Sequence, residues 1–283
     1  MYNEEKIISK WIADMYDYEE TDITDVEFAL SVIGTNPKRI LEIACGSGRI
    51  LVPLGKAGHL VAGLDFDEYM LSKISPKSKG MKNITWQKSD VIKDNWGNGY
   101  DVVMLAANFL FNIVADIDYA KAQALVIKKS ADALVSGGHI YIDYGYTLHP
   151  EKWFGSGGEN IIWQGTDNNG NTGKMTLLDG SYDSMTGLNK FTRRFELLLP
   201  DGTEIKQDIP SIKHFATLEQ IHHWLEVSDF IVEEEYGDYS RNPISETTNR
   251  AIIWARKKVS LLPRKRGCKI FCVYGNEIFQ IRI

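Results

Sequence analysis

The sequence predicts an α/β fold in which helices cover both faces of a mostly parallel sheet, with an antiparallel β subdomain inserted into the chain. Two observations lead to this prediction. Short apolar runs alternate with helical patterns between residues 39 and 144, and turn motifs separate strand-like runs between residues 150 and 212. Alternating strands and helices are typical of a parallel sheet buried on both faces, whereas closely spaced turns are typical of antiparallel strands.

Residues 1–34 are predicted to form a helical cap. Apolar residues at helical spacing indicate one helix over residues 7–15 and a second helix that starts after Thr24 and Asp25 and ends at Gly34. The acidic stretch of residues 16–22 is expected to link the two helices.

Residues 35–149 and 213–258 are predicted to form the α/β domain. Its strands are expected at residues 39–43, 59–64, 84–87, 100–105, 139–144, 231–236 and 250–256. Its helices are expected at residues 49–57, 69–74, 119–134 and 218–225, with Gly137 and Gly138 ending the third of them.

Residues 150–212 are predicted to form the inserted antiparallel subdomain. Strand-like runs at residues 160–166, 174–182 and 189–199 alternate with turns. Arg193 and Arg194 could meet an acidic substrate, but a solvated strand face is the favoured interpretation.

Residues 259–283 form a C-terminal extension to which the sequence assigns no role. Apolar residues within residues 270–281, with Gly275 and Asn276 as a turn, permit a hairpin there.

The composition excludes several classes of protein. The 283 residues include 32 Lys and Arg against 38 Asp and Glu, which gives a net charge of −6 and argues against a nucleic-acid partner. No apolar run reaches the roughly 18 residues of a membrane-spanning helix, and no secretory signal is expected at the N-terminus. The three cysteines build no disulfide framework, and Cys268 and Cys272 lack the partner histidines of a metal site. We therefore expect a cytoplasmic protein without a metal ion and without a membrane partner.

One segment indicates a nucleotide-containing ligand. The strand at residues 39–43 runs into the small-residue loop of residues 44–48, and Asp65 ends the next strand. Such a loop lets a ligand approach the backbone and the N–H groups at the helix start, and Asp65 is placed to accept hydrogen bonds from a ribose diol. A dinucleotide site needs a third glycine where Leu51 stands. Glu42 would repel a pyrophosphate but suits a cationic amino-acid group.

This segment resembles the first motif of class I S-adenosylmethionine-dependent methyltransferases, acidic-x-Gly-x-Gly-x-Gly, and the resemblance covers residues 36–258. It implies a Rossmann-like sheet, S-adenosyl-L-methionine as cofactor and S-adenosyl-L-homocysteine as product. Glu42 would orient the methionine amino group, Asp65 the ribose and Asp90 the adenine. Ala44 replaces the first glycine of the motif, which is tolerable at negative φ but would cost cofactor affinity at positive φ. The cofactor-binding residues that the resemblance implies are Tyr16, Glu42, Ala44, Cys45, Gly46, Gly48, Arg49, Asp65, Phe66, Met70, Asp90, Val91, Ala106 and Phe109.

A narrower resemblance points to bacterial small-molecule methyltransferases, including the amino-sugar N-methyltransferases of macrolide biosynthesis. Tyr16 and Asp17, the insertion after the fifth strand and the segment of residues 236–243 carry it. It implies a small-molecule acceptor that is methylated at nitrogen or oxygen, and an insertion that covers the active site or forms a dimer interface. The protein would then be a monomer or a homodimer.

Methyl transfer is an in-line displacement that depends mainly on alignment and on exclusion of water. A base is needed only when the nucleophile arrives protonated. The catalytic candidates are His214, at the return from the insertion, Tyr144, after the fifth strand, and Asn108, after the fourth strand. Further candidates in the same regions are Asp143 and Tyr146, after the fifth strand, and Tyr239 and Arg241, in the closing loop.

Three other functions stay open at this point. The first is a nicotinamide-dependent oxidoreductase on a Rossmann fold, and the second is a non-catalytic protein that binds S-adenosylmethionine. The third is a methyltransferase that acts on nucleic acid or protein, which the acidic balance disfavours.

Overall fold

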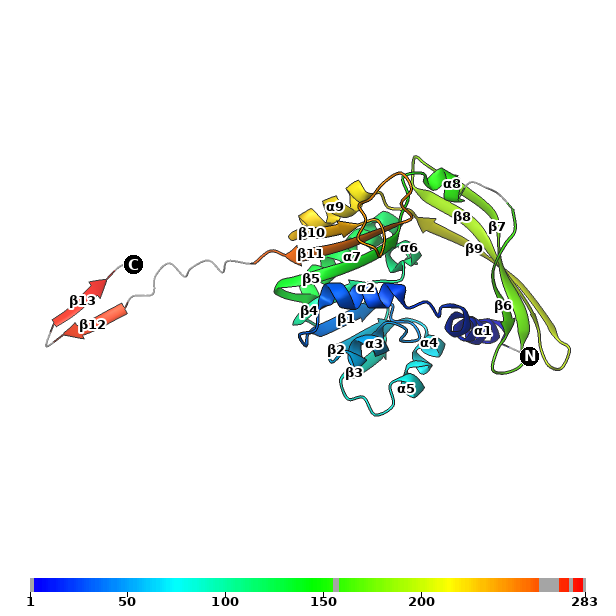
Figure 1. Cartoon of the computed structure of the whole chain (residues 1–283), viewed down its shortest axis with the longest axis horizontal. Helices are drawn as coiled ribbons and strands as arrows, with labels where there is room; N and C mark the ends of the chain where they lie inside the picture. The colour runs from blue at the N-terminus through cyan, green and yellow to red at the C-terminus, as the bar shows by residue number, and fades with distance from the viewer. Residues whose placement is uncertain (1–2, 155–157, 260–269, 275–276, 282–283) are drawn as a thin grey trace.

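The computed structural model describes residues 3–154, 158–259, 270–274 and 277–281, and a seven-stranded sheet forms its centre (Figure 1). The strand order is β10-β11-β5-β4-β1-β2-β3. These strands are β1 (Arg39–Ile43), β2 (Leu60–Asp65), β3 (Ile84–Lys88), β4 (Tyr100–Leu105), β5 (Leu134–Gly145), β10 (Phe230–Tyr236) and β11 (Arg250–Lys257). Strands β1 to β5 pair in parallel, whereas β11 pairs antiparallel with β5 and with β10. The α/β fold class predicted from the sequence is confirmed.

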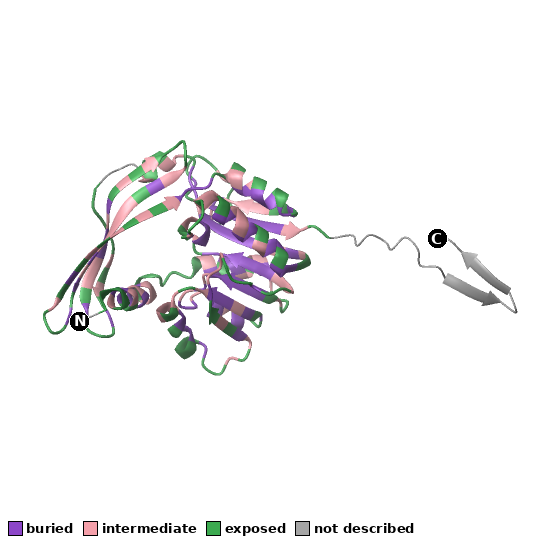
Figure 2. Cartoon of the chain, turned by 180° about the vertical axis from the view of Figure 1, so that it is seen from behind, coloured by how far each residue is buried: buried purple, intermediate pink, exposed green. Residues whose placement is uncertain are grey.

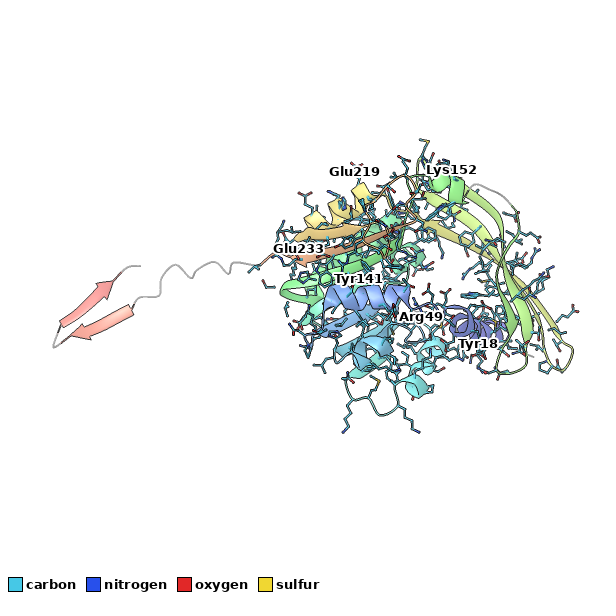
Figure 3. The ribbon with its side chains drawn as sticks, viewed as in Figure 1. Tyr18, Arg49, Tyr141, Lys152, Glu219 and Glu233 are labelled. Atoms are coloured by element: carbon cyan, nitrogen blue, oxygen red, sulfur yellow. The ribbon has the colours of Figure 1, made fainter. Side chains whose placement is uncertain are left out.

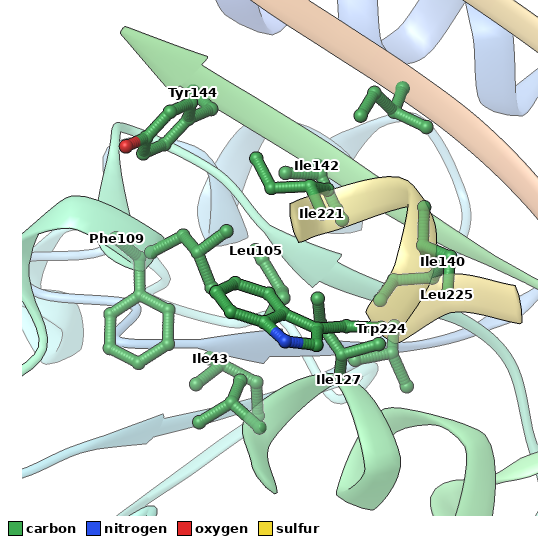
Figure 4. Close-up of a cluster of buried hydrophobic side chains, with 14 of the residues drawn as sticks. Ile43, Leu105, Phe109, Ile127, Ile140, Ile142, Tyr144, Ile221, Trp224 and Leu225 are labelled. Carbon is green, nitrogen blue, oxygen red and sulfur yellow. The ribbon is translucent and has the colours of Figure 1, made fainter. Parts of the chain in front are cut away.

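Helices cover both faces of this sheet. The helices of the described residues are α1 (Glu4–Glu19), α2 (Thr24–Ile33), α3 (Leu51–Lys56), α4 (Glu68–Ser72), α5 (Ile74–Lys77), α6 (Phe109–Asn112), α7 (Tyr119–Ala133), α8 (Pro150–Phe154) and α9 (Leu218–Val227). One apolar cluster joins the sheet to α7 and α9, and Figure 4 shows Ile127 of α7, Trp224 of α9 and Ile142 of β5 within this cluster. A second cluster packs α2 and α3 on the other face. The strands between these layers are the most buried part of the molecule (Figure 2).

A separate four-stranded antiparallel sheet arches away from the seven-stranded sheet (Figure 1). Its strands, in sequential order, are β6 (Asn160–Thr166), β7 (Thr172–Asp183), β8 (Leu188–Leu198) and β9 (Glu204–His214). The antiparallel character predicted for this part of the chain is confirmed.

Helix α1 packs on the four-stranded sheet. Trp11 and Met15 share an apolar cluster with Phe195 of β8, and the Trp11 indole N–H donates to the carbonyl oxygen of Gly165 at 3.2 Å. The buried Asp14 carboxylate forms an ion pair with Lys73, which lies between α4 and α5. The helix therefore connects the four-stranded sheet to the helices beside β2.

Three details differ from the sequence-based expectation. Residues 16–19 continue α1 instead of starting a link. Helix α7 ends at Ala133, and Gly137 and Gly138 lie inside β5, at the point where its pairing register with β4 shifts. The added fourth strand of the insertion, β9, was not predicted, because its pattern is largely polar and contains Pro210; an edge strand tolerates both features.

The boundaries assigned to the cap, the α/β domain, the insertion and the extension stay predictions. In the extension, β12 (Ile270–Tyr274) and β13 (Glu277–Ile281) pair antiparallel, as a hairpin requires. Gly275, Asn276 and Cys268 lie outside the described residues. Across the described ranges, no helix combines the length and the apolar character that crossing a membrane requires.

Candidate functional site

The loop of residues 44–48 joins β1 to the turn before α3 and lies against β2. Gly46 and Gly48 have φ values of +53° and +80°, which glycine adopts without a steric cost. The Gly46 N–H donates to Asp65 Oδ2 at 2.8 Å. A Cβ atom on Gly63 of β2 would lie 2.6 Å from Cys45 Sγ, so the loop and the strand are in direct contact. Burial raises the pKa of the Cys45 thiol, which makes this residue a packing group and not a nucleophile.

Ala44 has φ +56°, in the left-handed region. The glycine that the motif calls for would reach this conformation freely, whereas an alanine there costs about 1–2 kcal/mol. The sequence predicted that alanine at this position would be unfavourable if its φ were positive, and the structure shows a positive φ.

Two carboxylates, Glu42 and Asp65, belong to the last residues of β1 and β2, at the carboxyl edge of the sheet. Glu42 is 3% exposed, and its Oε2 atom has no hydrogen-bond partner among the described residues. Burial raises the pKa of Glu42 well above its usual range, and the charge of Arg49 lowers it in part. Burial also raises the pKa of Asp65, while the hydrogen bonds that it accepts from the N–H groups of Asp67 and Gly46 lower this pKa in part.

An unpartnered buried carboxylate beside a glycine loop is costly unless a ligand supplies donors. Glu42 fits the ammonium group of an amino acid, and Asp65, oriented by two backbone N–H groups, keeps lone pairs for ribose hydroxyls. The residues of this loop therefore fit S-adenosylmethionine.

Arg49 ties the loop to the two N-terminal helices. Its guanidinium forms a bidentate ion pair with Asp25 of α2 at 2.7 and 2.6 Å. Its Nε lies 3.5 Å from the Tyr16 hydroxyl of α1, and its Nη1 donates to the carbonyl oxygen of Asp22 at 3.0 Å. Figure 3 shows Arg49 between these helices and the sheet. Burial raises the pKa of Tyr16, so this hydroxyl stays protonated.

The loop after β3 contains the predicted adenine-binding residues. Asp90 Oδ1 accepts the N–H of Ile92 at 3.0 Å, and the Asp90 N–H donates to Asp94 Oδ2 at 2.8 Å. Burial acts to raise the pKa of Asp90, but hydrogen bonds from the backbone N–H groups of Lys93 and Ile92 and from the Lys93 ammonium outweigh it and lower the pKa. The Val91 carbonyl oxygen accepts the Trp96 indole N–H at 2.9 Å. This loop is thus held by its own hydrogen bonds.

Phe66 and Met70 were predicted to flank the adenine. Phe66 follows β2 and is 70% exposed, with the Lys88 ammonium 5.6 Å from its ring centroid. Met70 of α4 lines the cavity described next. An exposed aromatic ring beside Asp65 is available to stack on a ligand.

A cavity of about 1340 Å³ separates the carboxyl edge of the seven-stranded sheet from the four-stranded sheet. Ligands of open α/β sheets bind at this edge, next to the point where the strand order reverses, which here lies between β1 and β4. The predicted site residues that line the cavity are Tyr16, Arg49, Met70 and Asn108.

Ala106 and Phe109 were also predicted to contact the cofactor. Ala106 directly follows β4 and is buried, and Phe109 belongs to the apolar cluster under α7 and α9 (Figure 4). Phe109 therefore packs in the core, and the neighbouring Ala107 and Asn108 are the residues of this segment that line the cavity.

Of the catalytic candidates His214, Tyr144 and Asn108, only Asn108 lines the cavity. Its N–H donates to the Asp143 carbonyl oxygen at 3.1 Å, and its Oδ1 accepts the N–H of Gly145 at 3.0 Å. Its side chain is therefore fixed between the ends of β4 and β5.

Tyr144 and His214 are buried and are not among the residues that line this cavity, and their catalytic role stays a prediction. The Tyr144 hydroxyl accepts the Ala216 N–H at 2.8 Å, and His214 Nδ1 lies 2.7 Å from Gln123 Oε1. Burial raises the pKa of Tyr144 and lowers that of His214. These contacts connect the segment after β9 to β5 and α7, where the chain leaves the four-stranded sheet.

The structure also brings Arg250, which the sequence did not assign to the site, together with Tyr239 and Asp143, which were candidates from the sequence. Arg250 and Tyr239 line the cavity, and both contact the buried Asp143: Arg250 by an ion pair and Tyr239 by a hydrogen bond of 2.8 Å. Burial raises the pKa of Asp143, while the charge of Arg250 and the Tyr239 hydroxyl lower it. Arg193 and Lys213 of the four-stranded sheet line the opposite wall.

The described residues contain no group of three or more His, Cys, Asp and Glu side chains arranged to hold a metal ion.

Comparison with known proteins identifies the domain. Residues 40–138 match the family model described as a methyltransferase domain. A putative methyltransferase of Geobacillus sp. (strain WCH70) is 22% identical over 222 residues, which make up 78% of this chain and 85% of the relative.

Two solved structures have a similar fold. An S-adenosylmethionine-dependent methyltransferase from Clostridium acetobutylicum ATCC 824 superposes with a TM-score of 0.68 at 16% identity, over 87% of this chain and 96% of that one. The sugar N-methyltransferase KedS8 from Streptoalloteichus sp ATCC 53650 superposes with a TM-score of 0.64 at 13% identity, over 86% of this chain and 91% of that one.

The sheet order, the glycine loop and the acids at the ends of β1 and β2 are those of a Rossmann-like fold of the class I type. Residues 40–138 are a methyltransferase domain, and the site residues fit S-adenosyl-L-methionine as its cofactor. The alternative of a nicotinamide-dependent oxidoreductase is set aside.

Proposed function

We propose that this methyltransferase acts on nitrogen or oxygen of a small molecule that binds in the cavity between the two sheets. The observation that supports the proposal is the position of the cavity: one wall is the carboxyl edge of the seven-stranded sheet, with Arg49 and Asn108, and the other is the four-stranded sheet. Its volume of about 1340 Å³ exceeds the roughly 300–1,000 Å³ of common ligand pockets. It is large enough for an acceptor beside part of the cofactor.

The lining supports a compact organic acceptor. Trp163, Phe191 and Phe111 supply aromatic surface, and polar and charged side chains line much of the rest of the cavity. Small-molecule sites combine apolar surface with polar groups that fix the orientation of the ligand. The likeness to a sugar N-methyltransferase agrees with an acceptor of this size.

The residues of the chain would hold the cofactor and leave its reactive end toward the cavity. Glu42 would accept hydrogen bonds from the amino group, Asp65 from the ribose hydroxyls, and the loop of Asp90 and Val91 would meet the adenine. When bound, S-adenosylmethionine supplies a methyl group on a positively charged sulfur.

On the acceptor side, the chain would align the nucleophile and exclude water. Helix α1 and the four-stranded sheet would enclose the acceptor, and Asn108, fixed by its contacts at the ends of β4 and β5, would position it. A neutral amine needs no base before attack, so the core positions of Tyr144 and His214 are compatible with transfer to nitrogen.

The test incubates the enzyme with cofactor that carries a labelled methyl group, in parallel with a library of small amines and hydroxy compounds, with RNA and with protein. We expect label in the small-molecule fraction, and none with Asp65→Ala. Label confined to RNA or to protein would overturn the proposal, and so would binding of S-adenosylhomocysteine without any transfer across the library.

A further inference from the structure

Arg193 and Lys213 face the cavity from neighbouring strands of the four-stranded sheet. Arg193 lies on β8 opposite Ile209, and Lys213 lies on β9 opposite Asn189. All four residues line the cavity, so the two cations belong to the inner face of the sheet.

Among the residues that the structure describes, neither cation has an anionic partner. Arg193 Nε donates to Ser211 Oγ at 2.9 Å, and Lys213 contacts the Asn112 side-chain oxygen while its ammonium lies 5.2 Å from the Phe111 ring centroid. Within residues 3–154 and 158–259, no carboxylate lies within 4.0 Å of either charged group.

The other cations nearby are paired. Arg194, on the outer face of β8, forms a bidentate ion pair with Asp208 at 2.7 and 2.6 Å. Arg49 and Arg250, which also line the cavity, pair with Asp25 and Asp143. Among the cations of the described residues that line the cavity, Arg193 and Lys213 therefore differ from Arg49 and Arg250 in having no carboxylate beside them.

Unpaired cations in a partly desolvated wall are unfavourable until an anion approaches. Burial lowers the pKa of Arg193, and burial together with the charge of Arg193 lowers the pKa of Lys213 to about 8. An anionic ligand would relieve both effects, since it would replace lost hydration and screen the two charges from each other.

We propose that the acceptor carries a carboxylate or phosphate group, and that Arg193 and Lys213 bind this group on the inner face of the four-stranded sheet. The proposal rests on the proposed function and names the class of its substrate. Lys213 contacts Asn112 of α6, which places the anion site next to this helix. Asn112 stands four residues after Asn108 in the sequence. Phe111 and Phe191 lie beside the Lys213 ammonium and would pack on the apolar body of the acceptor.

The test measures binding of three simple probes by calorimetry, on enzyme saturated with S-adenosylhomocysteine: benzoate, phenyl phosphate and neutral benzamide. We expect the wild type to bind at least one anion about tenfold or more tightly than benzamide, because a hydrogen bond to a charged group contributes about 1.5–3 kcal/mol. The anion that binds more tightly indicates whether the natural group is a carboxylate or a phosphate.

The variants Arg193→Met and Lys213→Met keep the apolar stems and should each weaken anion binding about tenfold, without changing the affinity for S-adenosylhomocysteine. Arg194→Met, on the outer face of the same strand, is the matched control and should bind the anion as the wild type does. Equal binding of anions and benzamide by the wild type would overturn the proposal. So would an equal loss in Arg194→Met and Arg193→Met. Failure of the wild type to bind S-adenosylhomocysteine would instead reject the cofactor site itself.

A pH titration gives a second readout. Lys213 is charged below a pKa of about 8, and the groups that surround it are Arg193, Asn112, Phe111 and Phe191, of which only Arg193 is charged. Benzoate stays ionised in this range, so its affinity should fall as pH rises above about 8, and Lys213→Met should lack this fall. A wild-type affinity that stays constant from neutral to alkaline pH would contradict the role of Lys213.

Discussion

Replacing Ala44 with glycine isolates the cost of the departure from the glycine motif. Ala44 has φ +56°, and an alanine in this region costs about 1–2 kcal/mol. Glycine removes this cost, but it adds backbone freedom to the unfolded chain worth about 0.5–1 kcal/mol, and it removes a half-buried methyl group worth about 0.4 kcal/mol. The free energy of unfolding should therefore lie between about 0.4 kcal/mol below and about 1.1 kcal/mol above that of the wild type, with a midpoint slightly above it.

Ala57→Gly is the matched control, because Ala57 has φ −74° and is exposed. The same substitution relieves no strain there, so it should lower the free energy of unfolding by about 0.5–1 kcal/mol. Urea unfolding followed by tryptophan fluorescence measures both variants, and equal m-values make their midpoints comparable. If Ala44→Gly were destabilised as much as Ala57→Gly, the argument from backbone strain would be refuted.

The same pair of variants tests where the strain acts. If the loop keeps its φ when the cofactor binds, the strain is present in both states and cancels from the binding free energy. The affinity for S-adenosylhomocysteine should then change by less than about twofold, so that the cost falls on stability and not, as the sequence suggested, on affinity. A tenfold gain in affinity for Ala44→Gly would show that the strain increases on binding.

Three further substitutions test the site and its supports. Asp65→Ala should abolish binding of S-adenosylhomocysteine in calorimetry, because Asp65 both orients the loop and is proposed to hold the ribose; unchanged affinity would remove it from the cofactor site. Tyr144→Phe leaves the Ala216 N–H without its partner in the core, so urea unfolding should show a loss of about 1–3 kcal/mol while the transfer rate per folded enzyme stays constant. A lower rate at unchanged stability would instead support a catalytic role for Tyr144. Trp11→Phe loses the hydrogen bond to the Gly165 carbonyl, and hydrogen exchange in α1 should become faster; unaltered exchange would show that this contact does not hold the helix.

The central strands could be predicted because their signals are local. The bounds of β1, β4 and β6 agree with the sequence-based ranges. In β1 the apolar run of residues 40–43 is interrupted only by Glu42, and in β4 it is continuous from Val102 to Leu105. The acids at the ends of β1 and β2 follow from the same strands, so the cofactor residues Glu42 and Asp65 could be assigned with them.

The signals at other boundaries were ambiguous. Gly137 and Gly138 follow a helical pattern, which favours a helix stop, but the structure uses them inside β5. Gly137 has φ +77°, and a Cβ atom on Gly138 would lie 3.0 Å from the Asp101 carbonyl oxygen of β4. Close approach of two strands and a helix end both require glycine, and only the tertiary structure decides between them.

The anion site shows most clearly what sequence reasoning could and could not reach. Phe191, Arg193, Phe195 and Leu197 alternate along β8, so Arg193 shares a face with apolar residues, and this pattern alone argues against a solvated position. The pattern does not say what covers that face. Helix α1 packs on Phe195 and Leu197 and leaves the part with Phe191 and Arg193 open to the cavity. A helix about 180 residues earlier in the chain therefore determines which part of β8 is buried in the core and which part lines the cavity. The cation within the apolar alternation can be recognised in the sequence, but its role in binding follows only from how α1 packs on the strand.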